Sequence, residues 1–261
     1  MSDRTPAPFG RRPLRVEQAR DVGAYRLLVL ADPDGPEPRP GQFYMLAATE
    51  RWGGGEDERP WLPRAFSQLR GAGGRLQFLL EDVGPGTARL AELVPGDECF
   101  VLGPLGTGFE PPPGDRRALL VGGGIGIVPL AGWDDELRGA TTLLGFSDAA
   151  HAEAAGLFAD ARNATDDGSA GHHGFVTGLL TKELDRDPGA VVYACGPPPM
   201  LEAVRALTAE RGTPAQLALE AGMACGYGAC FGCAVPTKDG FIRLCLEGPV
   251  LDAAMLDEVP A

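Results

Sequence analysis

The sequence predicts an antiparallel β-barrel followed by an α/β domain with a doubly wound parallel sheet, and a small third domain at the C-terminus. Three observations lead to this fold class. Short strands separated by turn residues fill the first 110 residues, strands alternate with helical stretches from residue 117, and four of the six cysteines lie within residues 225–245. A chain of 261 residues is long enough for two domains and an appendage, at about 100 to 200 residues per domain. We place the domains at residues 1–113, 114–214 and 215–261.

The barrel prediction rests on short apolar segments that end in clusters of Gly, Pro and Asp. Predicted strands cover residues 24–30, 42–47, 75–81 and 98–102, and turn clusters cover residues 32–41 and 94–97. Residues 50–60 form a Gly-rich, charged surface loop to which we assign no role. At the Pro-rich residues 111–115 the pattern changes from short strands to strands that alternate with helices, so the first domain should end there.

The α/β prediction rests on strands that are each followed by a helical stretch. The strands are expected at residues 118–121, 141–146 and 190–195, and the helices at residues 127–138, 150–162 and 198–210. Such alternation is typical of a parallel sheet whose ligands bind at the carboxyl ends of the strands.

Composition excludes two classes of partner. The 36 acidic residues exceed the 23 Lys and Arg residues by 13, so the basic face that nucleic acids require is not expected. The longest uncharged run, residues 118–133, is interrupted by glycines and a proline, so we expect no membrane span. The N-terminus has no apolar signal core, and we therefore expect a cytoplasmic protein.

The cysteines near the C-terminus have the spacing C-x4-C-x2-C-x11-C, formed by Cys225, Cys230, Cys233 and Cys245. This is the spacing of plant-type 2Fe–2S sites. The three glycines of the loop remove side chains that would keep the backbone from approaching the sulfurs, and Cys245 should lie on a returning strand at residues 240–246. The alternative is a structural zinc site, although zinc modules more often pair two short knuckles.

Two glycine-rich turns predict a nucleotide site in the second domain. The first follows a strand and opens a helix, where exposed N–H groups can hold a pyrophosphate; its glycines are Gly122, Gly123, Gly124 and Gly126. The second follows a later strand and begins with Cys195 and Gly196. A tight strand–helix turn without a ligand is the alternative. Asp148, after the second strand, favours NAD over NADP if it faces a ribose, or it simply caps the next helix.

A flavin site is the third prediction. In the first domain, residues 64–67 precede a strand and residues 79–87 follow one, so an Arg, hydroxyl groups and a Gly-containing turn could hold a diphosphate. Each signal is weak alone, because an Arg beside a strand is usually a solvated surface residue. Nicotinamide delivers a two-electron hydride and an iron–sulfur cluster accepts single electrons, so a chain that binds both needs a converter, which is usually a flavin.

Taken together, these segments resemble the electron-transfer (iron–sulfur flavoprotein) subunit of NAD-dependent dihydroorotate dehydrogenase, within the ferredoxin reductase-like superfamily. The resemblance covers residues 25–252. Its most specific segments are residues 223–233, the last cysteine segment at residues 245–250, and Thr-Asp-Asp-Gly-Ser at residues 165–169. It also includes residues 40–44, 64–67, 84–87, 103–109, 122–129, 174–177 and 193–197. One departure is Ala65, where the flavin motif usually has Pro, and the turn should be less rigid for it.

The resemblance implies a flavin-binding barrel, an NAD-binding α/β domain and a 2Fe–2S domain. It implies that the four cysteines ligate iron and that the two glycine turns face NAD. It also implies that FAD is contacted by Arg64, Ala65, Phe66, Ser67, Leu80, Glu81, Val83, Gly86 and Thr87.

The implied activity is transfer of a hydride from NADH to FAD, and of single electrons through the cluster to a partner. That partner would be an FMN-containing dihydroorotate dehydrogenase subunit, in a heterotetramer with two copies of each chain. We assign no catalytic acid–base residue, because no general base suited to dihydroorotate stands out. The alternative is a reductase subunit that serves a different oxidoreductase, such as a sulfhydrogenase or a sulfide dehydrogenase.

Overall fold

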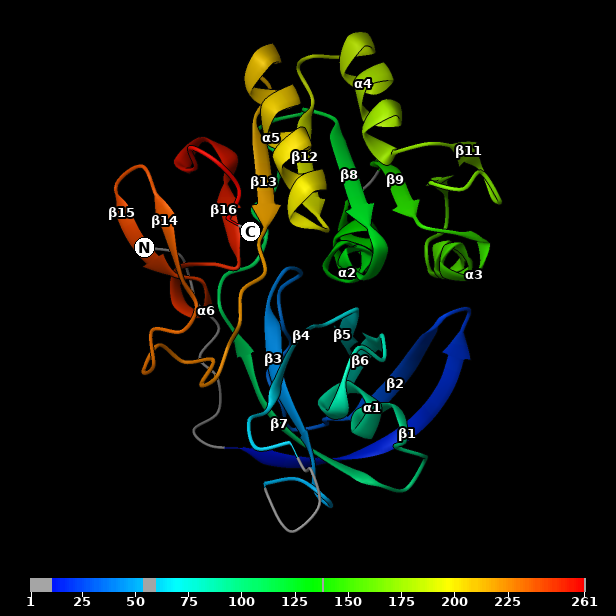
Figure 1. The fold of residues 1–261 in the computed structure, drawn as a ribbon, viewed down its shortest axis with the longest axis vertical. Coiled ribbons are helices and arrows are strands. Elements are labelled where there is room, and N and C mark those ends of the chain that lie inside the picture. The colour runs from blue at the N-terminus through cyan, green and yellow to red at the C-terminus, as the bar shows by residue number, and fades with distance from the viewer. Residues whose placement is uncertain (1–10, 54–59, 138, 261) are drawn as a thin grey trace.

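A computed structural model describes residues 11–53, 60–137 and 139–260 and contains two seven-stranded sheets and a small C-terminal unit (Figure 1). The middle of the predicted surface loop, residues 54–59, lies outside the described residues. In Figure 1 the N-terminal sheet lies below the second sheet, and the hairpin of β14 (Ala234–Thr237) and β15 (Gly240–Arg243) stands beside the second sheet.

The N-terminal sheet is antiparallel throughout and has the order β4–β3–β7–β1–β2–β6–β5. Its strands are β1 (Arg12–Val22), β2 (Tyr25–Ala31), β3 (Phe43–Ala48), β4 (Arg64–Ser67), β5 (Arg70–Ala72), β6 (Arg75–Leu80) and β7 (Glu98–Leu105). The four predicted strands correspond to β2, β3, β6 and β7. Strand β1 has no apolar run, because only alternate positions such as Leu14 and Val16 are buried. Helix α1 (Pro85–Ala91) packs against β3 and β6.

The second sheet has the order β11–β10–β9–β8–β12–β13–β16 and is parallel except for the last strand. Its strands are β8 (Ala118–Gly123), β9 (Thr141–Phe146), β10 (Ala161–Thr165), β11 (His172–His173), β12 (Val191–Cys195), β13 (Ala215–Ala218) and β16 (Val250–Asp252). The order of the parallel strands reverses at β8, and that switch point is where open α/β sheets bind ligands.

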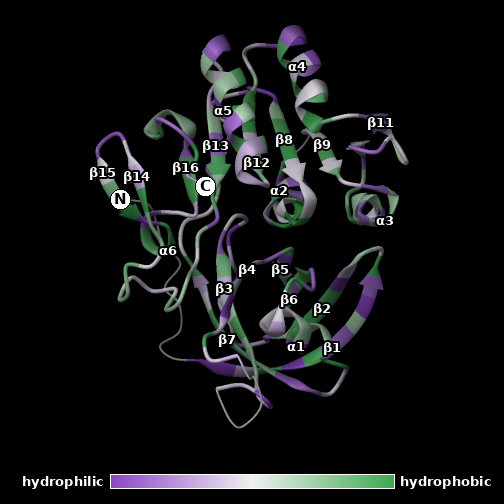
Figure 2. Cartoon of the chain, viewed as in Figure 1, coloured by the Kyte–Doolittle hydropathy of each residue, from purple (hydrophilic) through white to green (hydrophobic). Residues whose placement is uncertain are grey.

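The two faces of this sheet bury different cores, because side chains alternate along each strand. Leu119 and Val121 of β8 pack with α4 (Val176–Arg186) and α5 (Pro198–Arg211) on one face. Leu120 packs on the opposite face with α2 (Val128–Glu136), which lies between the sheet and the barrel (Figure 1). Figure 2 shows β8 as hydrophobic and the outer turns of α4 as hydrophilic, which fits a buried sheet under a solvated helix.

Two predicted elements were wrong. Residues 150–162 are not one helix: they contain the end of α3 (Ala149–Ala152), a 3-10 helix (Glu153–Leu157) and the start of β10. Cys245 does not lie on a returning strand, because β15 (Gly240–Arg243) ends before it and the residue sits in the one-turn helix α6 (Leu244–Glu247).

The C-terminal segment interleaves with the α/β domain. Strand β13 begins directly after the predicted boundary at residue 214 and extends the parallel sheet, and β16 pairs with it. Between them lie the cysteine loop, the hairpin of β14 (Ala234–Thr237) and β15, and α6. No helix in the described part of the chain is both long and apolar enough to cross a bilayer.

Candidate flavin, nucleotide and cluster sites

A cavity of about 260 Å³ lies where the barrel meets the second sheet and the C-terminal segment. Its polar wall includes the side chains of Arg64, Ser67, Glu81 and Thr87. Of the residues predicted to contact FAD, all but Leu80 and Gly86 line this cavity. Its lining residues are Phe43, Arg64, Ala65, Phe66, Ser67, Leu79, Glu81, Val83, Thr87, Ile125, Val128, Leu219, Glu220, Ala221, Met223 and Pro249.

The two predicted residues outside the lining have other positions. Leu80 is buried in the barrel core. Gly86 lies directly beside Arg64: a Cβ on this glycine would come within 2.5 Å of the Arg64 Nε. Gly86 therefore leaves room for the guanidinium, which also donates to the carbonyl oxygen of Leu62 at 2.6 Å.

The Gly-Pro-Gly-Thr turn forms the start of α1. Gly84 precedes the helix and Pro85 occupies its first turn, where a missing N–H costs nothing. The Thr87 hydroxyl oxygen accepts the N–H groups of Val83 at 2.9 Å and Gly84 at 3.0 Å. The hydroxyl thus holds the turn in shape, and the turn presents its backbone beside Arg64.

Sequence reasoning missed the cavity residues that come from the C-terminal segment, above all Glu220 and Met223. Burial raises the pKa of the Glu220 carboxyl. Their position in the sequence could have indicated these residues. They lie between β13, the last parallel strand, and the cysteine loop, where the predicted flavin and cluster sites must be linked.

A second cavity of about 540 Å³ opens at the carboxyl ends of β8, β9 and β12. Its lining residues are Tyr25, Glu81, Gly123, Gly124, Gly145, Phe146, Ser147, His151, Asp166, Phe175, Val176, Thr177, Pro197, Pro199, Met200 and Ala203. Two of the predicted glycines, Gly123 and Gly124, are therefore on its wall. Glu81 lines both cavities, so the two cavities meet at this side chain.

The other predicted residues of the glycine turns do not line the cavity. They are Gly122, Gly126, Cys195 and Gly196. A Cβ on Gly126 would lie 2.6 Å from the Cys195 carbonyl oxygen and from Gly196, and one on Gly122 would lie 2.9 Å from Ile127. The absence of a side chain at Gly126 lets the two turns touch. Cys195 is buried, and burial, together with the nearby Glu220, raises the pKa of its thiol well above the usual value.

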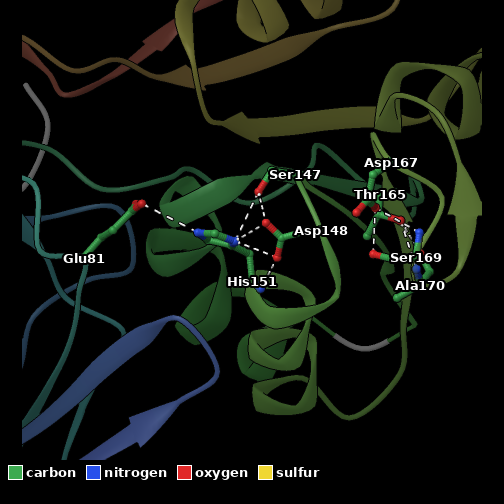
Figure 3. A network of polar contacts seen from close by, with 8 residues as sticks. All are labelled: Glu81, Ser147, Asp148, His151, Thr165, Asp167, Ser169 and Ala170. Carbon is green, nitrogen blue, oxygen red and sulfur yellow. Dashed lines mark hydrogen bonds and ion pairs between the residues drawn. The ribbon is translucent and has the colours of Figure 1, made fainter.

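Asp148 caps α3, as the second of its two sequence interpretations expects. Its carboxylate accepts the His151 backbone N–H at 3.1 Å and contacts the ring Nδ1 at 2.9 Å (Figure 3). These bonds from His151 lower the pKa of Asp148 to about 2. Across the domain boundary, His151 Nε2 lies 3.8 Å from Glu81 Oε1, and its ring meets Tyr25 edge-on at 5.4 Å.

The aspartate that lines the second cavity is instead Asp166, in the Thr-Asp-Asp-Gly-Ser segment. Figure 3 shows why this turn is well defined: Thr165 Oγ1 donates to the Ala170 carbonyl at 2.9 Å, and Ser169 Oγ donates to Asp167 at 2.6 Å. Sequence reasoning singled out the segment but gave it no position.

The four cysteines predicted to ligate iron lie near one another. Cys225 is close enough to Cys230, and Cys245 to Cys233, for each neighbouring thiol to shift its pKa. Within the described residues, no three His, Cys, Asp or Glu side chains surround one point as a single metal ion requires. Two neighbouring thiols at each end of the loop match the ligand arrangement of a two-iron cluster, in which each iron takes two protein ligands.

Backbone geometry around the thiols also fits a cluster. Gly226 and Gly228 have φ angles of +78° and +89°, which favour glycine. A Cβ on Gly228 would lie 2.4 Å from Leu246. Burial opposes ionisation of Cys225, but N–H groups of the loop bond its sulfur and lower its pKa to about 6. Amide N–H groups aimed at sulfur are what a cluster site provides.

The sequence and structure are similar to those of characterised proteins. A model of the iron–sulfur cluster binding domain of dihydroorotate dehydrogenase B matches residues 220–257. The electron transfer subunit of dihydroorotate dehydrogenase B (NAD(+)) from Geobacillus kaustophilus is 40% identical, over 82% of this chain and 85% of that one. The subunit of the same name from Clostridium acetobutylicum is 34% identical, over 87% and 89%.

Solved structures show the same fold at low identity. A chain of the NADH-dependent reduced ferredoxin–NADP oxidoreductase superposes with a TM-score of 0.79 at 22% identity, over 96% of this chain and 92% of that one. A ferredoxin–NADP⁺ reductase from Neisseria gonorrhoeae, solved with FAD and NADP, gives 0.62 at 17% identity, over 77% and 92%.

These comparisons confirm the predicted fold class and the prediction of an iron–sulfur oxidoreductase subunit with an electron-transfer role. The family model and the relatives also agree with the predicted iron–sulfur cluster and NAD as cofactors, and with a dihydroorotate dehydrogenase subunit as the partner. With about 40% identity over most of its length, the chain belongs to the family of electron transfer subunits of dihydroorotate dehydrogenase B (NAD(+)).

Proposed function

We propose that FAD binds in the cavity of Arg64 and Ser67, that NADH binds in the cavity of Gly123 and Gly124, and that a 2Fe–2S cluster is held by the four cysteines. Electrons from NADH then leave through the cysteine loop to the flavin of the catalytic subunit. When bound, FAD supplies the exchange between two-electron and one-electron chemistry.

The observation that carries this proposal is the continuity of the three sites. Glu81 belongs to both cavities. Met223 lines the flavin cavity and lies two residues before Cys225. The flavin cavity is thus bordered by the nucleotide cavity on one side and by the cluster loop on the other, which is the order that the electrons need.

Each group of residues has a physical task in this scheme. Arg64 provides the positive charge that a diphosphate requires, and Ser67 a hydroxyl beside it. The contact of Gly126 with Cys195 and Gly196 holds the two turns together, so that the N–H groups at the end of β8 are available to NADH. Apolar residues such as Phe43 and Leu219 line the flavin cavity and would exclude water from a bound ring.

The nucleotide cavity favours NAD over NADP. In the part of the chain that the structure describes, its lining contains the carboxylates Glu81 and Asp166 and no Lys or Arg. A 2′-phosphate would meet negative charge there without a compensating cation, whereas a ribose hydroxyl can donate to a carboxylate.

Partner and compartment complete the proposal. The chain should assemble with its catalytic subunit in a heterotetramer with two copies of each. We expect both in the cytoplasm, because all six cysteines are free in the structure and cluster thiolates need a reducing compartment.

The test uses protein purified without oxygen. The wild type should contain one FAD and two irons per chain, and NADH should bleach its flavin and produce the paramagnetic signal of a reduced cluster. Cys233→Ala should lose the iron and the electron delivery to the catalytic subunit, while NADH still reduces its FAD.

Cys99→Ala is the matched control, because Cys99 is a buried cysteine of the barrel, away from the loop. It should keep its iron. Wild-type protein that binds flavin but no iron, or one zinc per chain, would refute the cluster assignment.

A further inference from the structure

Residues 50–53 begin the surface loop to which the sequence assigns no role, and they lie against the proposed flavin site. Trp52 is half-buried and packs with Phe66 onto the barrel core. The Arg64 Cζ stands 5.8 Å from the centre of the Trp52 ring. That distance is within the range in which an aromatic face attracts a guanidinium.

Arg64 needs such support in this chain. It lies on β4, which among the described strands pairs only with β3 and forms the edge of the sheet. The position after it is the exposed Ala65, where the flavin motif usually has Pro. An edge strand without that proline leaves the backbone of Arg64 freer before the cofactor binds, and this freedom must be lost on binding.

The same loop is tied to α1, the other proposed flavin-binding element. Arg51 forms an ion pair with Glu92, the residue that caps the end of α1. Arg89 of α1 donates to the Glu50 carbonyl oxygen at 3.3 Å. The base of the loop is closed by the Gly53 N–H, which donates to the Pro60 carbonyl at 2.8 Å. Trp52 is therefore held in place from both sides.

We infer that Trp52 is a positioning residue for FAD: its ring holds the Arg64 guanidinium beside Gly86 in the orientation that receives the diphosphate. The contact of the Trp52 ring with Arg64 replaces the backbone rigidity that a proline at position 65 would supply. The inference rests on the proposed function, because it takes Arg64 to be the diphosphate ligand. Through Trp52, residues 50–53 thereby contribute to the retention of FAD.

The experiment is a double-mutant cycle on FAD affinity. The dissociation constant for FAD is measured by release of flavin from the full-length holoprotein on dilution, for the wild type, Trp52→Ala, Arg64→Ala and the double variant. Trp52→Phe keeps an aromatic ring, and Trp61→Ala removes a tryptophan of the same region that is 74% exposed. Riboflavin, which has no diphosphate, is titrated in parallel.

We expect Trp52→Ala to raise the FAD dissociation constant by about fivefold to tenfold, and Trp52→Phe and Trp61→Ala to change it less than about twofold. In the Arg64→Ala background, Trp52→Ala should add nothing, and riboflavin affinity should be unchanged throughout. An equal loss from Trp52→Ala with and without Arg64, or a loss for riboflavin as well, would mean that Trp52 acts on the barrel and not through Arg64. If Arg64→Ala itself leaves FAD binding unchanged, the assignment of Arg64 fails instead.

Discussion

At the scale of single residues, local motifs predicted many of the residues that line the two cavities, but not all of them. Arg64, Ser67 and Thr87 were predictable because each belongs to a short motif with a mechanism, and the structure brings all three to one cavity. Glu220 and Asp166 were not, because their positions in the sequence, although distinctive, do not show that their side chains face a cavity. Only the meeting of distant segments places them there.

Asp166 and Asp148 lend themselves to a matched test of nucleotide preference. Asp166 lines the nucleotide cavity, whereas Asp148 is engaged by His151. Asp166→Asn removes the negative charge that opposes a 2′-phosphate, so the preference for NADH over NADPH in kcat/KM should fall by about tenfold. Asp148→Asn should leave this preference within about twofold of the wild type.

The steady-state reduction of an artificial acceptor by the two nucleotides measures both variants. Loss of preference in Asp148→Asn, with no change in Asp166→Asn, would place the ribose at the α3 cap instead and contradict the assignment of Asp166.

At the scale of elements, apolar runs were sufficient to predict the central strands. Strands β8 and β12 are buried along their whole length and read as continuous apolar segments, and β9 has an apolar centre. Strand β10 has the sequence Ala-Arg-Asn-Ala-Thr and pairs near the sheet edge, so it has no such run and was absorbed into a predicted helix. The helical position of Cys245 was also unpredictable, since a single turn carries no periodicity.

Two glycines, one at the junction of β8 with α2 and one within α2, should respond in opposite ways to replacement by alanine. Gly126→Ala forces a Cβ to within 2.6 Å of the Cys195 carbonyl and Gly196, both backbone, so it should cost about 1–3 kcal/mol of stability and weaken NADH binding. Gly132→Ala, within α2, meets only ordinary contacts, the nearest at 3.4 Å to the Leu69 carbonyl oxygen. It should be neutral or should stabilise the protein by up to about 1 kcal/mol, because alanine favours the helix.

Urea unfolding and NADH titration of both variants test this difference. Equal stability of the two proteins would show that the β8 and β12 turns are not in the tight contact on which the nucleotide site depends.

At the scale of the whole molecule, the barrel and the α/β domain share one core. A single buried cluster includes Tyr25 and Leu79 of the barrel together with Leu120 and Val128 of the second domain. Sequence patterns separated the two domains, since each has its own periodicity, but could not show that they pack on each other. That packing is what places the flavin cavity between the nucleotide cavity and the cluster loop.

Phe109 tests the shared core, because it joins the two domains through aromatic contacts. It is 1% exposed, and its ring lies 6.0 Å from that of Trp133 in α2 and 5.7 Å from that of Tyr193 in β12. Phe109→Ala should cost about 3–5 kcal/mol, whereas Phe241→Ala, at a side chain that is 79% exposed, should change stability by less than about 0.5 kcal/mol. Since the two domains bury this core together, calorimetry should show one unfolding transition in the wild type, shifted to lower temperature as a unit in Phe109→Ala. A wild-type protein whose barrel and α/β domain melt in two separate steps, of which Phe109→Ala shifts only one, would mean that each domain is stable alone and that their contact is not what holds the cofactor sites in line.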